Sequence, residues 1–141
     1  MPSQPETFAE DVIDGSARDQ FEAFLDEHRR ALNQCLDELT EEQARRSLVP
    51  SSTTLLGLLK HATFVEKVWF DEAITCRPRA EIGIPAMPDE SFNLDDHDTI
   101  ATIRSAHRDA CEASRRAVAR LDLEDLVYGN RRGPLPLRWV Y

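Results

Sequence analysis

Hydrophobic residues recur at gaps of three and four in three long stretches of the chain, at about residues 19–39, 53–75 and 98–121. This spacing places them on one face of a helix, so it predicts three long amphipathic helices. The second stretch, about Thr53 to Thr75, is apolar around most of its circumference, which is typical of a central helix. Gly57 near its start is expected to allow a close approach of another helix.

Several residues indicate where these helices begin. Thr40 to Gln43 has the pattern of a capping box, which predicts a short helix to about Arg46. Ser51 or Ser52 is the expected N-cap of the second long helix, and Asp96 or Asp98 that of the third. Residues 1–17 contain Pro2, Pro5 and Gly15 and are expected to form a leader with little core of its own.

Two further segments complete the predicted order of elements. Residues 76–97 carry three prolines and little periodicity, so they are expected to form a long ordered loop that lines a site. A turn at Gly129–Gly133 precedes Pro136, which suits the first position of a helix. The last helix therefore starts near residue 136 and is expected to continue past Tyr141. The prediction is a single all-α domain over 1–141, an up-down four-helix bundle whose last helix is only begun.

Composition narrows the classes of function. The net charge of −9 and the short, dispersed arginine pairs disfavour nucleic acid as a partner, because such binding depends on neutralising phosphates. No run of apolar residues is long enough to span a membrane, and the acidic N-terminus is unlike a secretory signal, so we expect a cytoplasmic protein. The three cysteines have no short spacing, which excludes a CxxC motif and favours reduced thiols.

His61 is the sharpest candidate for chemistry, because it lies in the middle of the most apolar helix. Neutral imidazole can serve as a metal ligand or a general base near neutral pH. The alternative is a core histidine hydrogen-bonded to a neighbour. A metal site would need at least two more ligands from other helices.

Other polar residues fall on predicted inner faces. His28 lies in the apolar stripe of the first helix, where it is either a partly buried histidine near the rim of the bundle or a metal ligand. His107 and Cys111 are four residues apart on one helix face, which allows joint metal binding but also simple core packing. His97 lies in an acidic junction. Glu66 and His61 point to different sides of their helix, and Glu66 is expected to hold a buried arginine or a helix cap.

Several runs resemble the DinB-like superfamily. They are Leu48–His61, Val65–Glu66 with Trp69–Phe70, Leu39–Ala44 and the tail Gly133–Tyr141. The similarity is greatest to an actinobacterial subgroup of uncharacterised proteins related to mycothiol-dependent maleylpyruvate isomerase.

The resemblance implies a four-helix bundle, often a homodimer, that holds a divalent metal, zinc or nickel. One ligand is a histidine of the second helix, a position occupied here by His61, and two histidines of the last helix would lie beyond Tyr141. The metal activates a thiol such as mycothiol for transfer or isomerisation, so the partners are a small-molecule thiol or electrophile. The alternative is a non-catalytic metal-binding or stress-related bundle. Two histidines about one turn apart soon after Tyr141 would favour the enzyme.

Overall fold

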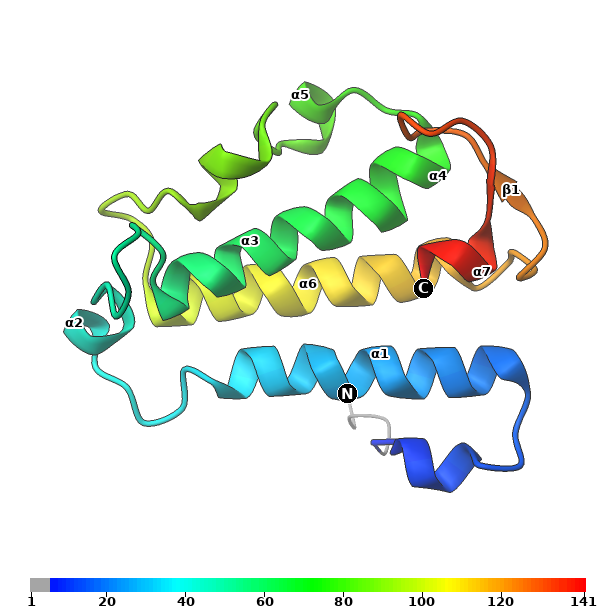
Figure 1. Cartoon of the computed structure of the whole chain (residues 1–141), viewed down its shortest axis with the longest axis horizontal. Coiled ribbons are helices and arrows are strands. Elements are labelled where there is room, and N and C mark those ends of the chain that lie inside the picture. The colour runs from blue at the N-terminus through cyan, green and yellow to red at the C-terminus, as the bar shows by residue number, and fades with distance from the viewer. Residues whose placement is uncertain (1–5) are drawn as a thin grey trace.

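The computed structural model describes residues 6–141, which are mostly helical (Figure 1). Three long helical segments run side by side, and α7 (Leu137–Val140) ends the chain against them. The long segments are α1 (Ala17–Gln34), α3 (Leu55–Lys67) continued by η2 (Val68–Glu72) and α4 (Ala73–Thr75), and α6 (Ile100–Val118). The all-α prediction is confirmed, whereas a complete four-helix bundle stays a prediction. None of the helices within residues 6–141 has the length and apolar character needed to cross a membrane.

The described part of the predicted leader, from residue 6 onward, contacts the first long helix. Residues 1–5 of that leader lie outside the described residues, but η1 (Ala9–Val12) forms a helical turn that packs on α1. The Ala9 N–H donates to the Glu27 carboxylate over 2.8 Å. The Arg30 guanidinium lies 5.0 Å from the centre of the Phe8 ring. These contacts tie the segment to the helix that follows it.

Helix boundaries differ from the predictions at several ends. The first helix ends at Gln34, not near Leu39, because the chain turns there and Glu38 adopts a left-handed φ of 62°. Leu36 lies in the turn after the helix but is still buried. The apolar spacing in the sequence therefore continues beyond the last helical residue. α2 (Glu41–Ala44) has the predicted capping box. The third long helix ends at Val118, one turn before the predicted Leu121.

The N-caps of the second and third long helices are threonines rather than the predicted serine and aspartate. Thr54 accepts a hydrogen bond from the Gly57 N–H, and Thr99 accepts one from Thr102. Both positions lie directly before the first helical residue, where a side-chain oxygen can reach the third helical N–H.

α3 occupies the centre, in contact with α1, α6 and the segment that follows it. One apolar cluster lies at the α2 end and includes Leu36, Leu56, Leu59 and Ile103. A second cluster at the other end comprises Phe70, Val118 and Leu137 with their neighbours. Between these clusters along α1, α3 and α6 lies a layer formed by the buried polar side chains of Arg29, Glu66, His107 and Ser114 and the buried thiol of Cys111.

The predicted loop of residues 76–97 is long and ordered, and it contains two short helices, α5 (Arg79–Ile82) and η3 (Pro88–Phe92). Arg79 ties it to the central helix. Its guanidinium pairs with Glu72 over 2.8 Å, donates to the Ala86 carbonyl over 2.7 Å, and lies 5.4 Å from the centre of the Phe64 ring. The sequence did not predict either short helix.

A small hairpin leads into the last helix. β1 (Leu126–Val127) and β2 (Leu135–Pro136) pair antiparallel, with Leu126 opposite Pro136. Its turn packs where η2 is followed by α4, and the Gly129 N–H donates to the carbonyl of Ala73, the first residue of α4, over 2.8 Å. Pro136 is the N-cap of α7, one position before the first helical residue rather than at it as predicted, and the role of α7 as the start of the fourth bundle helix stays a prediction.

Candidate functional site

His61 lies half-buried on α3, and η3 packs against its ring. The Phe92 ring is stacked on the imidazole with centroids 4.0 Å apart and planes 12° from parallel. The His61 Nδ1 atom is 2.6 Å from the Ser91 Oγ atom. The stacking fixes the ring plane and the hydrogen bond fixes its rotation.

The direction of this hydrogen bond follows from the neighbours of Ser91. A hydroxyl has a single proton, and that of Ser91 is donated to the Pro88 carbonyl. The Ser91 oxygen therefore accepts from His61, which places the imidazole proton on Nδ1 and leaves the lone pair on Nε2. Burial lowers the pKa of His61, which favours this neutral form. Ligating histidines commonly have this arrangement, with one nitrogen held by a hydrogen bond and the other available.

Gly57 explains how η3 comes so close to α3. A Cβ atom at Gly57 would lie 2.9 Å from the Phe92 carbonyl oxygen. The close approach predicted at Gly57 is therefore confirmed, and its partner is the segment that positions Ser91 and Phe92.

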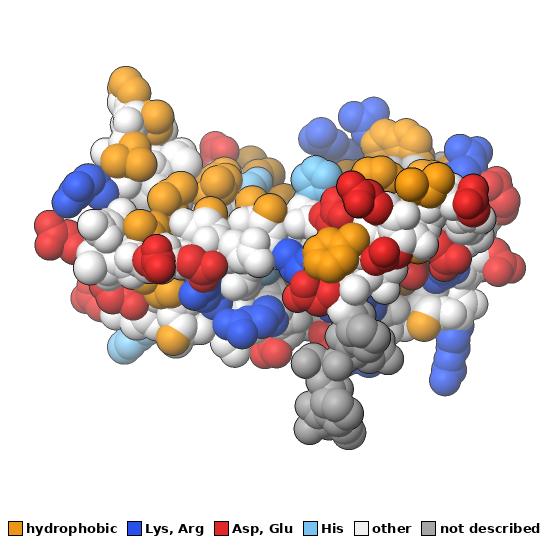
Figure 2. All heavy atoms as spheres, turned by 90° about the horizontal axis from the view of Figure 1, so that it is seen from below, with side chains coloured by type: hydrophobic (Ala, Val, Ile, Leu, Met, Phe, Trp, Pro, Cys, Tyr) orange, Lys and Arg blue, Asp and Glu red, His pale blue; other side chains and the backbone are white. Residues whose placement is uncertain are grey.

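Exposed apolar side chains flank His61 along α3. Leu58 and Val65, about one turn to either side, are 36% and 37% exposed. Further exposed apolar residues are Phe21 and Phe24 on α1 and Trp139 on α7. Figure 2, which views the molecule from the α1 side, shows hydrophobic side chains gathered along one long edge.

Glu66 holds a buried arginine, as predicted. The Arg29 Nε and Nη2 atoms donate to its two carboxylate oxygens over 2.5 and 2.8 Å, and Ser114 donates over 2.7 Å. Arg29 also reaches Asp26 over 2.8 Å. Burial alone would lower the pKa of Arg29, but the hydrogen bond and charge of Glu66 outweigh it and raise that pKa. The Arg29 guanidinium is therefore charged, and it is hydrogen-bonded to both Glu66 oxygens in the middle of the protein.

His107 and Cys111 lie beside this pair. The Cys111 Sγ atom is 3.6 Å from His107 Nε2 and 3.8 Å from a Glu66 oxygen. Burial, reinforced by the Glu66 charge, raises the pKa of Cys111 to about 12, so it is a thiol at neutral pH. Burial lowers the pKa of His107. No group of three side chains suited to holding a metal ion is found in residues 6–141, and the arrangement of these two favours core packing.

The two other histidines are exposed. His28 was predicted on the inner stripe, and this is wrong. Its ring turns back along the helix, where Nδ1 lies 2.7 Å from the Phe24 carbonyl oxygen. At this point of α1 the inward-facing residue is Arg29. The apolar spacing alone therefore placed the inner face at His28, one position too early. His97 lies in the acidic junction before α6, at the edge of a cavity described below.

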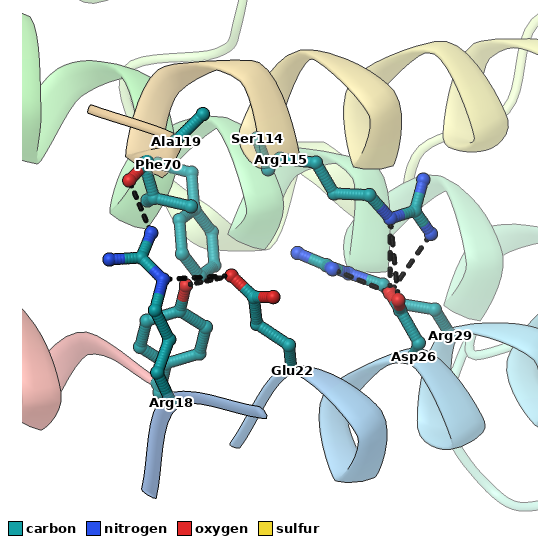
Figure 3. Close-up of a pocket in the computed structure, with 10 residues that line it drawn as sticks. Arg18, Glu22, Asp26, Arg29, Phe70, Ser114, Arg115 and Ala119 are labelled. Atoms are coloured by element: carbon teal, nitrogen blue, oxygen red, sulfur yellow. Dashed lines mark hydrogen bonds and ion pairs between the residues drawn. The ribbon is translucent and has the colours of Figure 1, made fainter. Parts of the chain in front are cut away.

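A charged cavity of about 300 Å³ lies between α1, η2, α6 and Tyr141 (Figure 3). Asp26 accepts hydrogen bonds from both Arg29 and Arg115 there. Glu22 accepts from Arg18 and from the Tyr141 hydroxyl. Sequence reasoning missed this cavity, although acids and arginines spaced four apart along α1 were a visible signal.

A second cavity of about 330 Å³ lies beneath residues 83–91, against α3 and the start of α6. Phe64 and Ser91 line it, and both also contact His61. The loop therefore lines a cavity that lies next to His61, and the role of that cavity as a functional site stays a prediction.

These features define a mostly helical protein whose central helix carries an oriented, neutral histidine. Residues 20–141 match the sequence profile of the Mycothiol-S-transferase family, and the chain belongs to that family. No curated protein and no solved structure matches the chain.

Proposed function

We propose that the protein transfers mycothiol to a small electrophilic molecule and that His61 is one ligand of a divalent metal, zinc or nickel, which activates the thiol. The observation that carries the metal proposal is the hydrogen-bond chain from His61 through Ser91 to Pro88, which leaves Nε2 free. The family membership of residues 20–141 supports mycothiol as the thiol.

His61 fits the part of a single imidazole ligand. The donors within residues 6–141 do not form a complete set, so we propose that the other ligands come from sequence beyond Tyr141. A bound metal of this kind lowers the pKa of a coordinated thiol and supplies thiolate at neutral pH. The contribution of the described residues is to hold the Nδ1 proton at Ser91 and to orient the ring against Phe92.

Metal content of the natural full-length protein tests the ligand. His61→Ala is compared with His28→Ala, because His28 is exposed and bonds only within its own helix. We expect the purified protein and His28→Ala to retain equal metal, and His61→Ala to lose most of it. Equal metal in all three proteins would refute the assignment. Ser91→Ala should weaken metal retention by about 10- to 100-fold in affinity, since it removes the group that orients the ligand.

Thiol consumption tests the reaction. Mycothiol and a panel of electrophiles are incubated with the protein, with and without added Zn²⁺, and loss of free thiol is followed. We expect consumption that requires both the metal and His61. Metal binding without thiol consumption for any electrophile would favour the alternative, a non-catalytic metal-binding bundle.

A further inference from the structure

The cavity beneath residues 83–91 has mostly apolar walls. Phe64 of α3, Ile84 and Pro85 of the covering segment, and Ile103 and Ala106 of α6 supply them. Its volume of about 330 Å³ is in the range of small-molecule sites. The covering segment is held in place by Arg79, so the cavity is formed without a ligand.

The cations of this cavity are unlike those elsewhere in the chain. The sequence contains 15 arginines and only two lysines, and both lysines, Lys60 and Lys67, line this one cavity. They are seven residues apart, two helical turns, and so share a face of α3.

The two lysines have different partners. The Lys60 ammonium pairs with Asp98 over 2.7 Å and donates to the Asn93 carbonyl over 2.8 Å, which fastens the covering segment to α3. The Lys67 ammonium makes no ion pair or hydrogen bond with any residue of the described part of the chain. Asp98 is the one carboxylate among the described lining residues, and Lys60 already neutralises it.

An apolar cavity with an uncompensated ammonium is therefore built into a protein of net charge −9. We propose that this cavity binds a small organic anion, with an apolar body against Phe64, Ile84 and Ile103 and a carboxylate paired with Lys67. A compact ammonium on a flexible stem can reach such a carboxylate from the wall. The inference does not depend on thiol transfer, because its test measures binding alone.

Three probes of one shape test the charge preference, namely 4-phenylbutyrate, 4-phenylbutanol and 4-phenylbutylamine. Their dissociation constants are measured by calorimetry on the full chain at low and high salt. We expect the carboxylate to bind more tightly than the alcohol and the amine to bind least, with the carboxylate's advantage reduced at high salt. Equal affinity of the carboxylate and the alcohol, or no binding of the carboxylate at millimolar concentration, would overturn the proposal.

Substitutions then locate the site. Lys67→Gln should weaken carboxylate binding about five- to tenfold and leave alcohol binding unchanged, as expected for one partly exposed ion pair. Arg120→Gln, at an exposed arginine outside the cavity, is the matched control and should change neither. Ala106→Trp, at an exposed position of the wall, should abolish binding of both probes without unfolding the protein. Unchanged carboxylate affinity in Lys67→Gln or in a folded Ala106→Trp would place the ligand elsewhere.

Discussion

The Arg29–Glu66 pair shows how much one residue can matter in the centre of this protein. The two side chains are 7% and 8% exposed and satisfy each other through two hydrogen bonds. Glu66→Leu would leave a buried guanidinium without its main partner, so we expect a loss of about 3–5 kcal/mol in the free energy of unfolding. Urea denaturation measures it. Glu112→Leu is the control, because it breaks an exposed pair with Arg116 and should cost no more than about 1 kcal/mol.

A double variant distinguishes the loss of attraction within the pair from the cost of leaving one buried charge without its partner. Arg29→Met combined with Glu66→Leu removes both charges, so it should recover most of the stability that Glu66→Leu alone loses. If the single variant were no less stable than Glu112→Leu, the pair would not have the role assigned to it.

His107 makes stability depend on pH. Burial lowers its pKa in the folded state below the ordinary 6.5, so below pH 6.5 the unfolded chain binds a proton that the folded protein does not. Stability therefore falls as pH falls from 6.5 toward the folded pKa, and His61 contributes with the same sign. We expect a flatter profile of unfolding midpoint between about pH 5 and 8 for His107→Asn than for the natural protein. Identical profiles would contradict a buried neutral imidazole.

Asp26 acts in a different window of pH. Burial raises the pKa of its carboxyl, but hydrogen bonds to Arg115 and Arg29 and their charges outweigh burial, so the net pKa is lowered from 3.8. The stability that Asp26 contributes is present above pH 3.8 and is lost as pH falls through the lower folded value. Asp26 therefore does not contribute to the slope near pH 6, which we assign to the lowered pKa values of His107 and His61.

Single residues also show what the sequence could and could not predict. A glutamate on an apolar helix needs a buried partner, so the role of Glu66 followed from its position. His61 stood out for the same reason. The orientation of its ring could not be predicted, because Ser91 and Phe92 are 30 and 31 residues away along the chain, in a segment without periodicity. The cavity beside Lys67 could not be predicted for the same reason, because the residues that cover it belong to the same segment.

At the scale of elements, the hairpin and the π-helical segment η2 fit only because Gly129 has no side chain. A Cβ atom there would lie 1.9 Å from the Glu72 carbonyl oxygen, a backbone atom that cannot move aside. We expect Gly129→Ala to lower the free energy of unfolding by about 1–3 kcal/mol, the usual cost of overpacking. Thermal unfolding followed by circular dichroism measures it.

Gly133 in the same hairpin provides the control. Its φ of 87° is left-handed, but open space surrounds its Cβ position. Asparagine tolerates the left-handed region, so Gly133→Asn should change stability by less than about 1 kcal/mol. Gly129 itself has no left-handed φ, so its requirement comes from contact with Glu72, and equal losses from both substitutions would contradict that assignment.

Elements were predictable where the signal was local. The capping box at Thr40 and the long apolar faces depend on neighbours three or four residues away, and both were confirmed. The end of α1 was not predicted, because Leu36 is buried from a turn and continues the helical spacing. The two strands, and the two short helices of residues 76–97, depend on contacts with α3 and its extension, which no local pattern contains.

At the scale of the whole molecule, a polar layer lies between two apolar clusters along the helices. Cys111 belongs to that layer, 3% exposed and with its pKa raised to about 12. Its thiol can react with an electrophile only when the protein opens. Cys35 and Cys76 are exposed, and burial raises the pKa of Cys35, so Cys76 should react fastest.

Alkylation by iodoacetamide, followed by mass spectrometry of peptides, therefore reports on the whole fold. In the native protein we expect adducts at Cys76 and then Cys35, with Cys111 modified only in denaturant. Glu66→Leu should accelerate modification of Cys111 and leave Cys76 unchanged, because it raises the population of open molecules without altering the surface. Modification of Cys111 as fast as that of Cys76 would show that the layer is open to solvent. Protection of Cys111 in the native protein would mean that the Arg29–Glu66 pair both stabilises the fold and keeps this thiol from reacting. A protein proposed to bring thiols and electrophiles together would then protect its own buried thiol from the electrophile.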